Sequence, residues 1–466
     1  MTSLSDAILS ESTETVQAVL AAGASINEVD DYGLTPLIET VLSGKQELAQ
    51  LLLDQGADVN EPDLTGSSPL HWAIENNQVG FCKLFLAYKA DPNAYNSAHQ
   101  PVLVKALLRD QHAIKKLLYA HGADLNFAQD YINTKLLGHR FELTEQVDIV
   151  NAKGHFVEIA FAGFFLEFTL GVIYYSLKNY LNNYAAREFR PYFHLLKPVL
   201  DALATANQLL HYQQYLLDYK KYASQIKMFL KADPLIIPIS YEGHAICLVR
   251  YKDILAKCDR GFNAKREGTV VIYRIGNPAA FTPELIEDLV FKRQNYEVIH
   301  KRLNEFLSLT KIGELPVPAQ IIGNCSWANI EAALPTLFFL LLSADSHMPA
   351  DLLGQLALNF YESWQNWDKD VALNECIQSF WLANPARKAS RAALLAAILF
   401  QTCKTDSELE QSRAKRILRV LTVPEYRYLL KAYLKVYETK YHTLQGKNLL
   451  RLLRETDYVY LPDYLD

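Results

Sequence analysis

The sequence predicts a multidomain α+β protein. It has an N-terminal array of helical repeats, a central unit built on an antiparallel sheet, and a helical C-terminal region. Three observations predict this arrangement: repeats of 33 residues in the first 130 positions, strand-like segments from Leu235, and apolar helical periodicity beyond residue 346. We expect domains at residues 1–130, 131–345 and 346–466.

The composition excludes several classes of protein. A chain of 466 residues that is 50% hydrophobic can bury more than one core. Its six cysteines form no CxxC pair, which argues against a zinc site or a disulfide scaffold. We also expect no metal or organic cofactor. The N-terminus lacks the pattern of a secretory signal, and the apolar run Ile159 to Leu177 carries Glu167. We therefore expect a buried segment there and no membrane span.

The N-terminal repeats keep three residue positions in phase. Pro36 and Pro69 suit the first turn of a helix, where a missing N–H costs nothing, and Gly56 and Gly122 suit the left-handed end of a helix. The pattern resembles the ankyrin family, with four repeats. The positions that recur every 33 residues are Leu4, Leu37, Leu70 and Leu103; Gly23, Gly56, Lys89 and Gly122; and Asn27, Asn60, Asn93 and Asn126.

The ankyrin resemblance implies a concave surface that binds proteins, because a single repeat cannot bury its own apolar faces. We interpret His71 as a buried residue that hydrogen-bonds at a helix start rather than as a metal ligand. The resemblance also implies that Asn60 and Asn93 could be hydroxylated by a host asparaginyl hydroxylase. The alternative is a turn asparagine that bonds its own backbone.

The central region carries a candidate nucleophile. The strand-like segments LIIPISY, HAICLVRY, ILAKC and TVVIYRI predict an antiparallel sheet, and a later Gly-Asn turn delivers Cys325 to the first turn of an apolar helix. A helix N-terminus stabilises a thiolate and supplies N–H donors for an oxyanion. Such a thiol needs a base and a group that orients the base.

His244 begins one strand and Asp259 ends its neighbour, so a hairpin can bring the two together. With Gln320 and Cys325 they follow the chain order His, Asp, Gln, Cys. This order resembles the Ulp1-like clan of cysteine proteases, whose fold is papain-like. The resemblance implies Cys325 as nucleophile, His244 as base, Asp259 as orienting acid and Gln320 as oxyanion donor, and it implies a host protein or ubiquitin-like conjugate as substrate.

The sequence departs from the clan beside these residues. Ala245 stands where the clan has Trp, and Asn324 and Ser326 flank the cysteine where it has Asp and Gly. The Gln-to-Cys gap is also one residue short. A rival base is His155, which has no evident acidic partner. An alternative function is therefore a catalytically silent scaffold that sequesters host factors.

Charge is distributed unevenly along the chain. Residues 1–130 carry 17 acidic and 7 basic side chains, whereas residues 386–454 carry 5 acidic and 15 basic ones. Basic residues such as Arg416 interleave there with tyrosines, which favours either a solvated helix face or contact with RNA or an acidic protein.

The C-terminal residues resemble a bacterial secretion signal and end in Tyr464-Leu465. Combined with the repeats and the Ulp1-like residues, they make the chain similar to the ankyrin-repeat effectors that Legionella exports by type IV secretion. This resemblance implies virulence-related work in a host cell, in the cytosol or the nucleus, through host protein partners.

Overall fold

The computed structural model describes residues 3–10, 13–261, 264–320 and 323–455. The predicted C-terminal signal at Tyr464-Leu465 lies outside them. The chain forms two compact units. Unit 1 comprises Met1–Asn133, Val150–Ile159 and His211–Gln225; unit 2 comprises Thr134–Ile149, Ala160–Leu210 and Ile226–Asp466. The predicted boundaries at residues 130 and 345 stay predictions.

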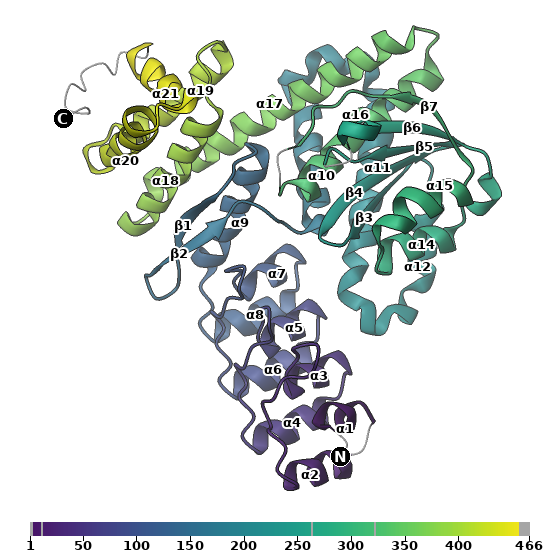
Figure 1. The fold of residues 1–466 in the computed structure, drawn as a ribbon, viewed down its shortest axis with the longest axis vertical. Coiled ribbons are helices and arrows are strands. Elements are labelled where there is room, and N and C mark those ends of the chain that lie inside the picture. Colours follow the sequence, from purple (N-terminus) through teal and green to yellow (C-terminus); the bar gives the residue numbers. More distant parts are fainter. Residues whose placement is uncertain (1–2, 11–12, 262–263, 321–322, 456–466) are drawn as a thin grey trace. The chain divides into compact units, whose positions relative to one another are not determined.

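Unit 1 contains four consecutive helix pairs, and the first helix of each pair packs on the first helix of the next (Figure 1). Their apolar sides are buried at the repeating leucines. The pairs are α1 (Leu4–Ser10) with α2 (Thr13–Ala21), α3 (Pro36–Leu42) with α4 (Gln46–Asp54), α5 (Pro69–Glu75) with α6 (Val79–Ala87), and α7 (Leu103–Leu108) with α8 (His112–Ala120). The prediction of N-terminal ankyrin repeats is confirmed.

The repeating asparagines connect one repeat to the next. The side-chain oxygen of Asn60 accepts the N–H of Asp91 at 2.8 Å, and that of Asn93 accepts the N–H of Asp124 at 2.7 Å. The expectation that these asparagines bond their own backbone is wrong. The aspartates two residues earlier occupy that role, because Asp58 accepts the N–H of Asn60 at 2.8 Å. Hydroxylation of Asn60 and Asn93 stays a prediction.

The helix ends of the repeats follow the sequence pattern. Gly56 and Gly122 adopt left-handed φ values of 93° and 87°, and Lys89, which replaces glycine at the same position, is forced to φ 65°. His71 caps α5: its Nδ1 accepts the N–H of Ser68 at 3.1 Å, and burial lowers its pKa to about 4. His71 is therefore a structural hydrogen-bonding residue, as predicted.

Unit 2 is built on an antiparallel sheet of five strands in chain order (Figure 1). This confirms the predicted antiparallel sheet. A separate two-stranded sheet pairs β1 (Gln146–Val150) with β2 (Phe156–Ala160). The five strands are β3 (Leu235–Tyr241), β4 (His244–Tyr251), β5 (Ile254–Cys258), β6 (Val270–Ile275) and β7 (Leu309–Glu314).

Most of the remaining described chain is helical, and helices form the C-terminal region, as predicted. The helices that precede β3 in the chain are α9 (Leu125–Arg140), α10 (Leu166–Leu181), η1 (Tyr184–Tyr192), α11 (Phe193–His211), η2 (Tyr212–Lys221) and α12 (Ala223–Leu230). Those between the strands of the five-stranded sheet are α13 (Ala264–Glu267), η3 (Pro278–Ala280), α14 (Pro283–Phe291), η4 (Val298–Arg302) and α15 (Leu303–Phe306). After it come α16 (Cys325–Asp345), α17 (Ala350–Leu382), α18 (Pro385–Thr402), α19 (Glu408–Leu421), η5 (Pro424–Tyr426), α20 (Arg427–Tyr433), η6 (Leu434–Lys440) and α21 (Leu444–Glu455).

Helix α16 is the central helix of unit 2 and packs on β4, β5, α10 and α17. Among the described helices it alone is long and apolar enough to cross a membrane, but 89% of its most apolar stretch is buried inside the structure. It is therefore a core helix. The run Ile159 to Leu177 is divided between the end of β2 and the start of α10, and Glu167 is buried there.

Candidate active site

The β4–β5 hairpin brings His244 and Asp259 together. β4 pairs with both β3 and β5, so His244 at its first residue lies beside the segment that follows Cys258. The Nε2 atom of His244 lies 3.0 Å from Oδ1 of Asp259. The His244 side chain is 27% exposed, whereas that of Asp259 is only 8% exposed. A buried carboxylate thus orients an imidazole that solvent can reach.

Cys325 is the first residue of α16, as predicted, and it is half-buried. Its thiol interacts with His244 and with the backbone of Ala245 and Ser326. Burial by itself raises the pKa of the thiol, but these hydrogen bonds outweigh burial and lower the pKa below its usual value. The helix N-terminus acts in the same direction.

The pKa of His244 shifts in the opposite direction to that of Cys325. Burial by itself lowers the pKa of the imidazole, but hydrogen bonds with Asp259 and Cys325 raise it to about 9. Burial by itself raises the pKa of the Asp259 carboxyl, but its hydrogen bond with His244 and the charge of that imidazole lower it below the usual value. Each of these shifts favours the charged form of its group, so the arrangement favours a thiolate, an imidazolium and a carboxylate in series.

The backbone between Asp259 and the next strand leaves no spare room beside the imidazole. A Cβ atom at Gly261 would lie 2.8 Å from Cε1 of His244 and 3.1 Å from Oδ1 of Asp259. The Gly261 N–H donates to the same oxygen at 3.1 Å. Glycine at this position therefore permits the close packing of acid and base.

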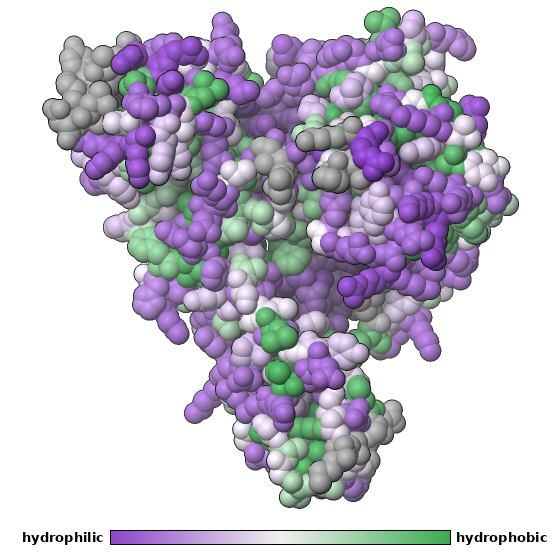
Figure 2. All heavy atoms as spheres, viewed as in Figure 1, coloured by the Kyte–Doolittle hydropathy of each residue, from purple (hydrophilic) through white to green (hydrophobic). Residues whose placement is uncertain are grey.

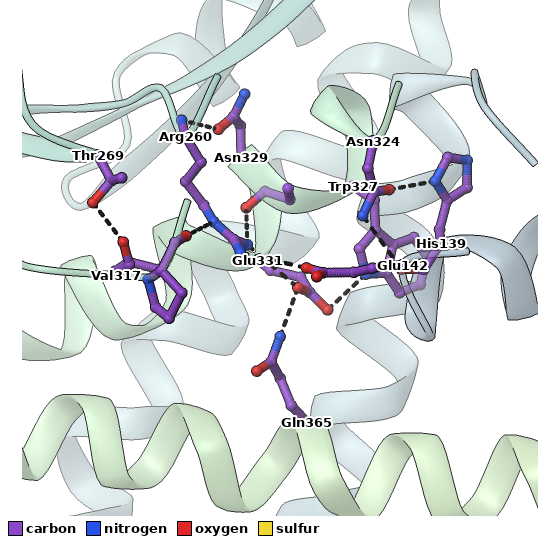
Figure 3. A network of polar contacts seen from close by, with 12 residues as sticks. His139, Glu142, Arg260, Thr269, Val317, Asn324, Trp327, Asn329, Glu331 and Gln365 are labelled. Atoms are coloured by element: carbon purple, nitrogen blue, oxygen red, sulfur yellow. Dashed lines mark hydrogen bonds and ion pairs between the residues drawn. The ribbon is translucent and has the colours of Figure 1, made fainter. Parts of the chain in front are cut away.

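The turn that precedes Cys325 is held from two sides. Gly323 adopts φ 88°, and its carbonyl accepts the N–H of Gly163 at 3.0 Å. The side chains of Asn324 and His139 are hydrogen-bonded, and the Asn324 amide also donates to the His139 carbonyl at 3.3 Å. Figure 3 shows this pair beside Trp327. The position of the candidate nucleophile is thus fixed by contacts from α9 and the segment after β2.

Gln320 lies on the segment that approaches α16. Its N–H donates to the Arg260 carbonyl at 3.0 Å, which places it beside the loop that follows Asp259. Its side-chain oxygen is buried and has no hydrogen-bond partner among the described residues. Residues 321–322, between Gln320 and the helix, lie outside those residues.

An ion-pair network supports the loop behind the candidate site (Figure 3). Arg260 is 2% exposed and its Nη1 lies 3.7 Å from Oε2 of the buried Glu331. Glu331 also accepts hydrogen bonds from Trp327 at 2.6 Å, Tyr361 at 3.0 Å and Gln365 at 2.8 Å. Burial raises the pKa of the Glu331 carboxyl, although Arg260 opposes this shift. These partners satisfy the buried charges and fix the loop.

The sequence analysis missed His300 and Tyr241. Nε2 of His300 lies 2.8 Å from the Tyr241 hydroxyl and 3.9 Å from Oδ2 of Asp259. Burial lowers the pKa of His300, which favours its neutral form. The Tyr241 ring packs edge-on to His244 at 5.5 Å between centroids. The contacts of His300 have no signal in the sequence, because His300 lies on η4, far along the chain from Tyr241 and Asp259.

Other sequence candidates lie elsewhere. His155 lies in the β1–β2 turn, where its N–H bonds the Asn151 side chain. Cys247 and Cys258 are fully buried, and burial raises the pKa of both thiols, that of Cys258 to about 12, which disfavours a reactive thiolate. Arg416 forms an ion pair with Asp370 and a hydrogen bond with Asn374, so its charge is already used within the protein.

Comparison with known proteins identifies the chain's relatives. A family model of three ankyrin repeats matches residues 4–96. No curated protein matches the chain. The solved structure of the Legionella effector AnkH is similar, with a TM-score of 0.82 and 44% identity, over 98% of this chain and 97% of that one. The resemblance to the Legionella ankyrin-repeat effectors is thereby confirmed. Since this identity extends over nearly the full length of both proteins, the chain belongs to the family of the Legionella effector AnkH.

Proposed function

We propose that this effector binds host proteins through its ankyrin repeats and that unit 2 is a cysteine hydrolase of the Ulp1-like type. The observation that carries the proposal is the contact of His244 with both Asp259 and the Cys325 thiol at the start of a helix. The proposed substrate is a host protein or a ubiquitin-like conjugate, and the proposed location is the host cytosol or nucleus, after type IV secretion.

The geometry supports a two-step acyl transfer. The Cys325 thiolate attacks the substrate carbonyl carbon, and the resulting oxyanion is stabilised by N–H groups at the start of α16 and by the amide of Gln320. The His244 imidazolium then gives its proton to the leaving amine as the carbon–nitrogen bond breaks. Next, neutral His244 takes a proton from water, which attacks the thioester and releases the acid and the free thiol. Asp259 keeps the imidazole oriented throughout.

A thiol-reactive probe tests the proposed chemistry. Ubiquitin and several ubiquitin-like proteins, each with an electrophile at the C-terminus, would be incubated with the full chain and analysed by mass spectrometry. We expect one covalent adduct, attached at Cys325 and absent in Cys325→Ala. The matched control is Cys376→Ala, whose thiol is buried in the C-terminal helices and which should label normally.

A second pair of variants tests the identity of the base. His244→Gln should abolish labelling by the probes and slow alkylation of Cys325 by iodoacetamide at neutral pH. His300→Gln should leave alkylation within about twofold of the native rate, because His300 contacts Asp259 rather than the thiol. Equal losses in both variants would contradict the assignment.

The alternative is a scaffold without catalytic activity. It would be favoured if Cys325 alkylates no faster than a free cysteine and no probe labels the chain. For RNA-associated partners, the exposed Lys415, Arg419 and Lys435 of the C-terminal helices are more suitable contacts than Arg416. RNA binding that weakens steeply with salt and in Arg419→Glu would support this reading.

A further inference from the structure

The first two ankyrin repeats enclose an acidic cavity of about 740 Å³. It is formed by α1, the segment that precedes α3, and α3 itself. Five carboxylate side chains line it, and no lysine, arginine or histidine does so among the described residues. The carboxylates are those of Asp6, Glu28, Asp30, Asp31 and Glu39.

One of these carboxylates is buried without a cation. Glu39 is 5% exposed; its Oε1 accepts a hydrogen bond from the Ser5 hydroxyl, and no donor among the described residues reaches its Oε2. The Asp30 carboxyl lies within hydrogen-bonding reach, but two carboxyl groups can bond only when one of them is protonated. The neighbouring charges are those of Asp6 and Asp30, both of the same sign. Lys45 follows α3, but its Nζ donates to the carbonyls of Ile8 and Leu9. A buried carboxylate in such a field is costly unless a positive charge approaches it.

The other walls of the cavity suit a side chain with an apolar stem. Leu9 is 60% exposed, Val29 is 41% exposed and Tyr32 is 86% exposed at its rim. Figure 2 shows apolar and hydrophilic residues intermingled over the repeat helices on the face that it presents. The methylene groups of lysine or arginine can pack on such a surface, and a cation can lie over the tyrosine ring. Among the described residues, no cluster has the geometry of a metal site.

We propose that this acidic cavity receives a lysine or arginine side chain of the partner protein that the ankyrin repeats bind. The proposal rests on the proposed role of the repeats as the partner-binding unit. It adds the chemistry of the contact: a basic side chain enters between α1 and α3 and supplies the positive charge that Glu39 and Asp30 lack.

The test uses the full chain and random peptides displayed on phage. We expect the selected peptides to share a basic residue, and the affinity of a selected peptide to fall about tenfold when its arginine is replaced by citrulline or its lysine is acetylated. Measured by fluorescence anisotropy, the same loss should follow Glu39→Gln or Asp30→Asn in the protein. Asn at position 30 can still accept the N–H groups of Tyr32 and Leu34, so the turn is retained.

Two controls separate charge from folding. Asp58→Asn removes an exposed carboxylate that follows α4 and lies outside the cavity, and it should leave the affinity within about twofold. Glu39→Gln should unfold at no lower temperature than the native chain, because it removes a buried charge from between like charges.

The dependence on pH gives an independent readout. Burial and Asp30 raise the pKa of Glu39 to about 7, against the lowering effect of Ser5. A bound cation favours the ionised form, so affinity should fall as the pH drops through 7 in the native chain but not in Glu39→Gln.

The failures can be told apart. Peptides that bind the native chain but ignore both cavity substitutions, or that lack basic residues, reject the cavity and leave binding by the repeats intact. If Asp58→Asn and the cavity variants weaken binding equally, recognition depends on the overall acidity of the repeats and the cavity is rejected. If no peptide is selected, the repeats themselves fail as the recognition unit and the cavity fails with them.

Discussion

The side-chain amide of Asn329 donates a hydrogen bond to the carbonyl oxygen of Ala245 at 2.6 Å. Its oxygen accepts the backbone N–H of Arg260 at 2.7 Å. These two backbone groups belong to the residues that directly follow His244 and Asp259. Asn329 lies one helical turn after the start of α16 and is 1% exposed. One buried amide therefore ties the helix that carries the thiol to β4, which carries His244, and to the segment after β5, which carries Asp259.

We predict that Asn329→Ala separates these three elements. Two buried backbone groups would lose their partners, so the free energy of unfolding should fall by about 1–3 kcal/mol. Alkylation of Cys325 at neutral pH should also slow, because the thiol and imidazole are no longer held in contact. Denaturant unfolding and iodoacetamide kinetics measure the two effects. Ser343→Ala on the same helix, whose exposed hydroxyl bonds only Phe339, is the control and should change neither.

Gly261→Ala should displace the imidazole. The new methyl group would lie 2.8 Å from Cε1 of His244, a distance that real Cβ atoms do not tolerate. We expect alkylation of Cys325 to slow at least about tenfold while the fold is retained. The control is Gly313→Ala in β7 of the same sheet, where a new Cβ atom would meet no atom within 4 Å. Cys325 should be alkylated at the native rate in this variant. Native reactivity in Gly261→Ala would show that the base does not need its observed position.

The pH dependence of substrate hydrolysis should report the ion pair of Cys325 and His244. Since the pKa of His244 is raised to about 9 and that of Cys325 is lowered, the charged pair exists between the two values. Hydrolysis that uses imidazolium as the acid should therefore decline as the pH rises through 9. Asp259→Asn removes the charge that supports the imidazolium, so this decline should begin at lower pH. A profile unchanged by Asp259→Asn contradicts the role of Asp259.

Lys89→Gly should stabilise the ankyrin repeats. Lys89 adopts φ 65° at a position where Gly56 and Gly122 adopt similar left-handed values. A side chain in this conformation costs about 1 kcal/mol that glycine does not incur. In Lys89→Gly, the ankyrin repeats of the full chain should unfold at a higher melting temperature. Lys83→Gly, inside helix α6, should lower the melting temperature, because glycine destabilises a helix interior by a similar free energy.

The sequence by itself determined the features that depend on neighbouring positions in the chain. The repeat of 33 residues predicted the ankyrin helices, and the strand-like segments LIIPISY and HAICLVRY predicted the antiparallel strands β3 and β4. A Gly-Asn turn before an apolar run predicted Cys325 at a helix start. These patterns are readable because turns, helix ends and periodic apolar faces are set by local backbone geometry.

Only the tertiary structure decided which distant side chains meet. His300 approaches Asp259, Arg260 pairs with Glu331, and Asn329 joins both strands to α16, yet none of these contacts has a fixed spacing in the sequence. The same is true of the cavity around Glu39, whose walls come from two repeats. Such contacts arise when packed elements bury polar groups that must then find partners, and packing depends on the whole core rather than on any one segment.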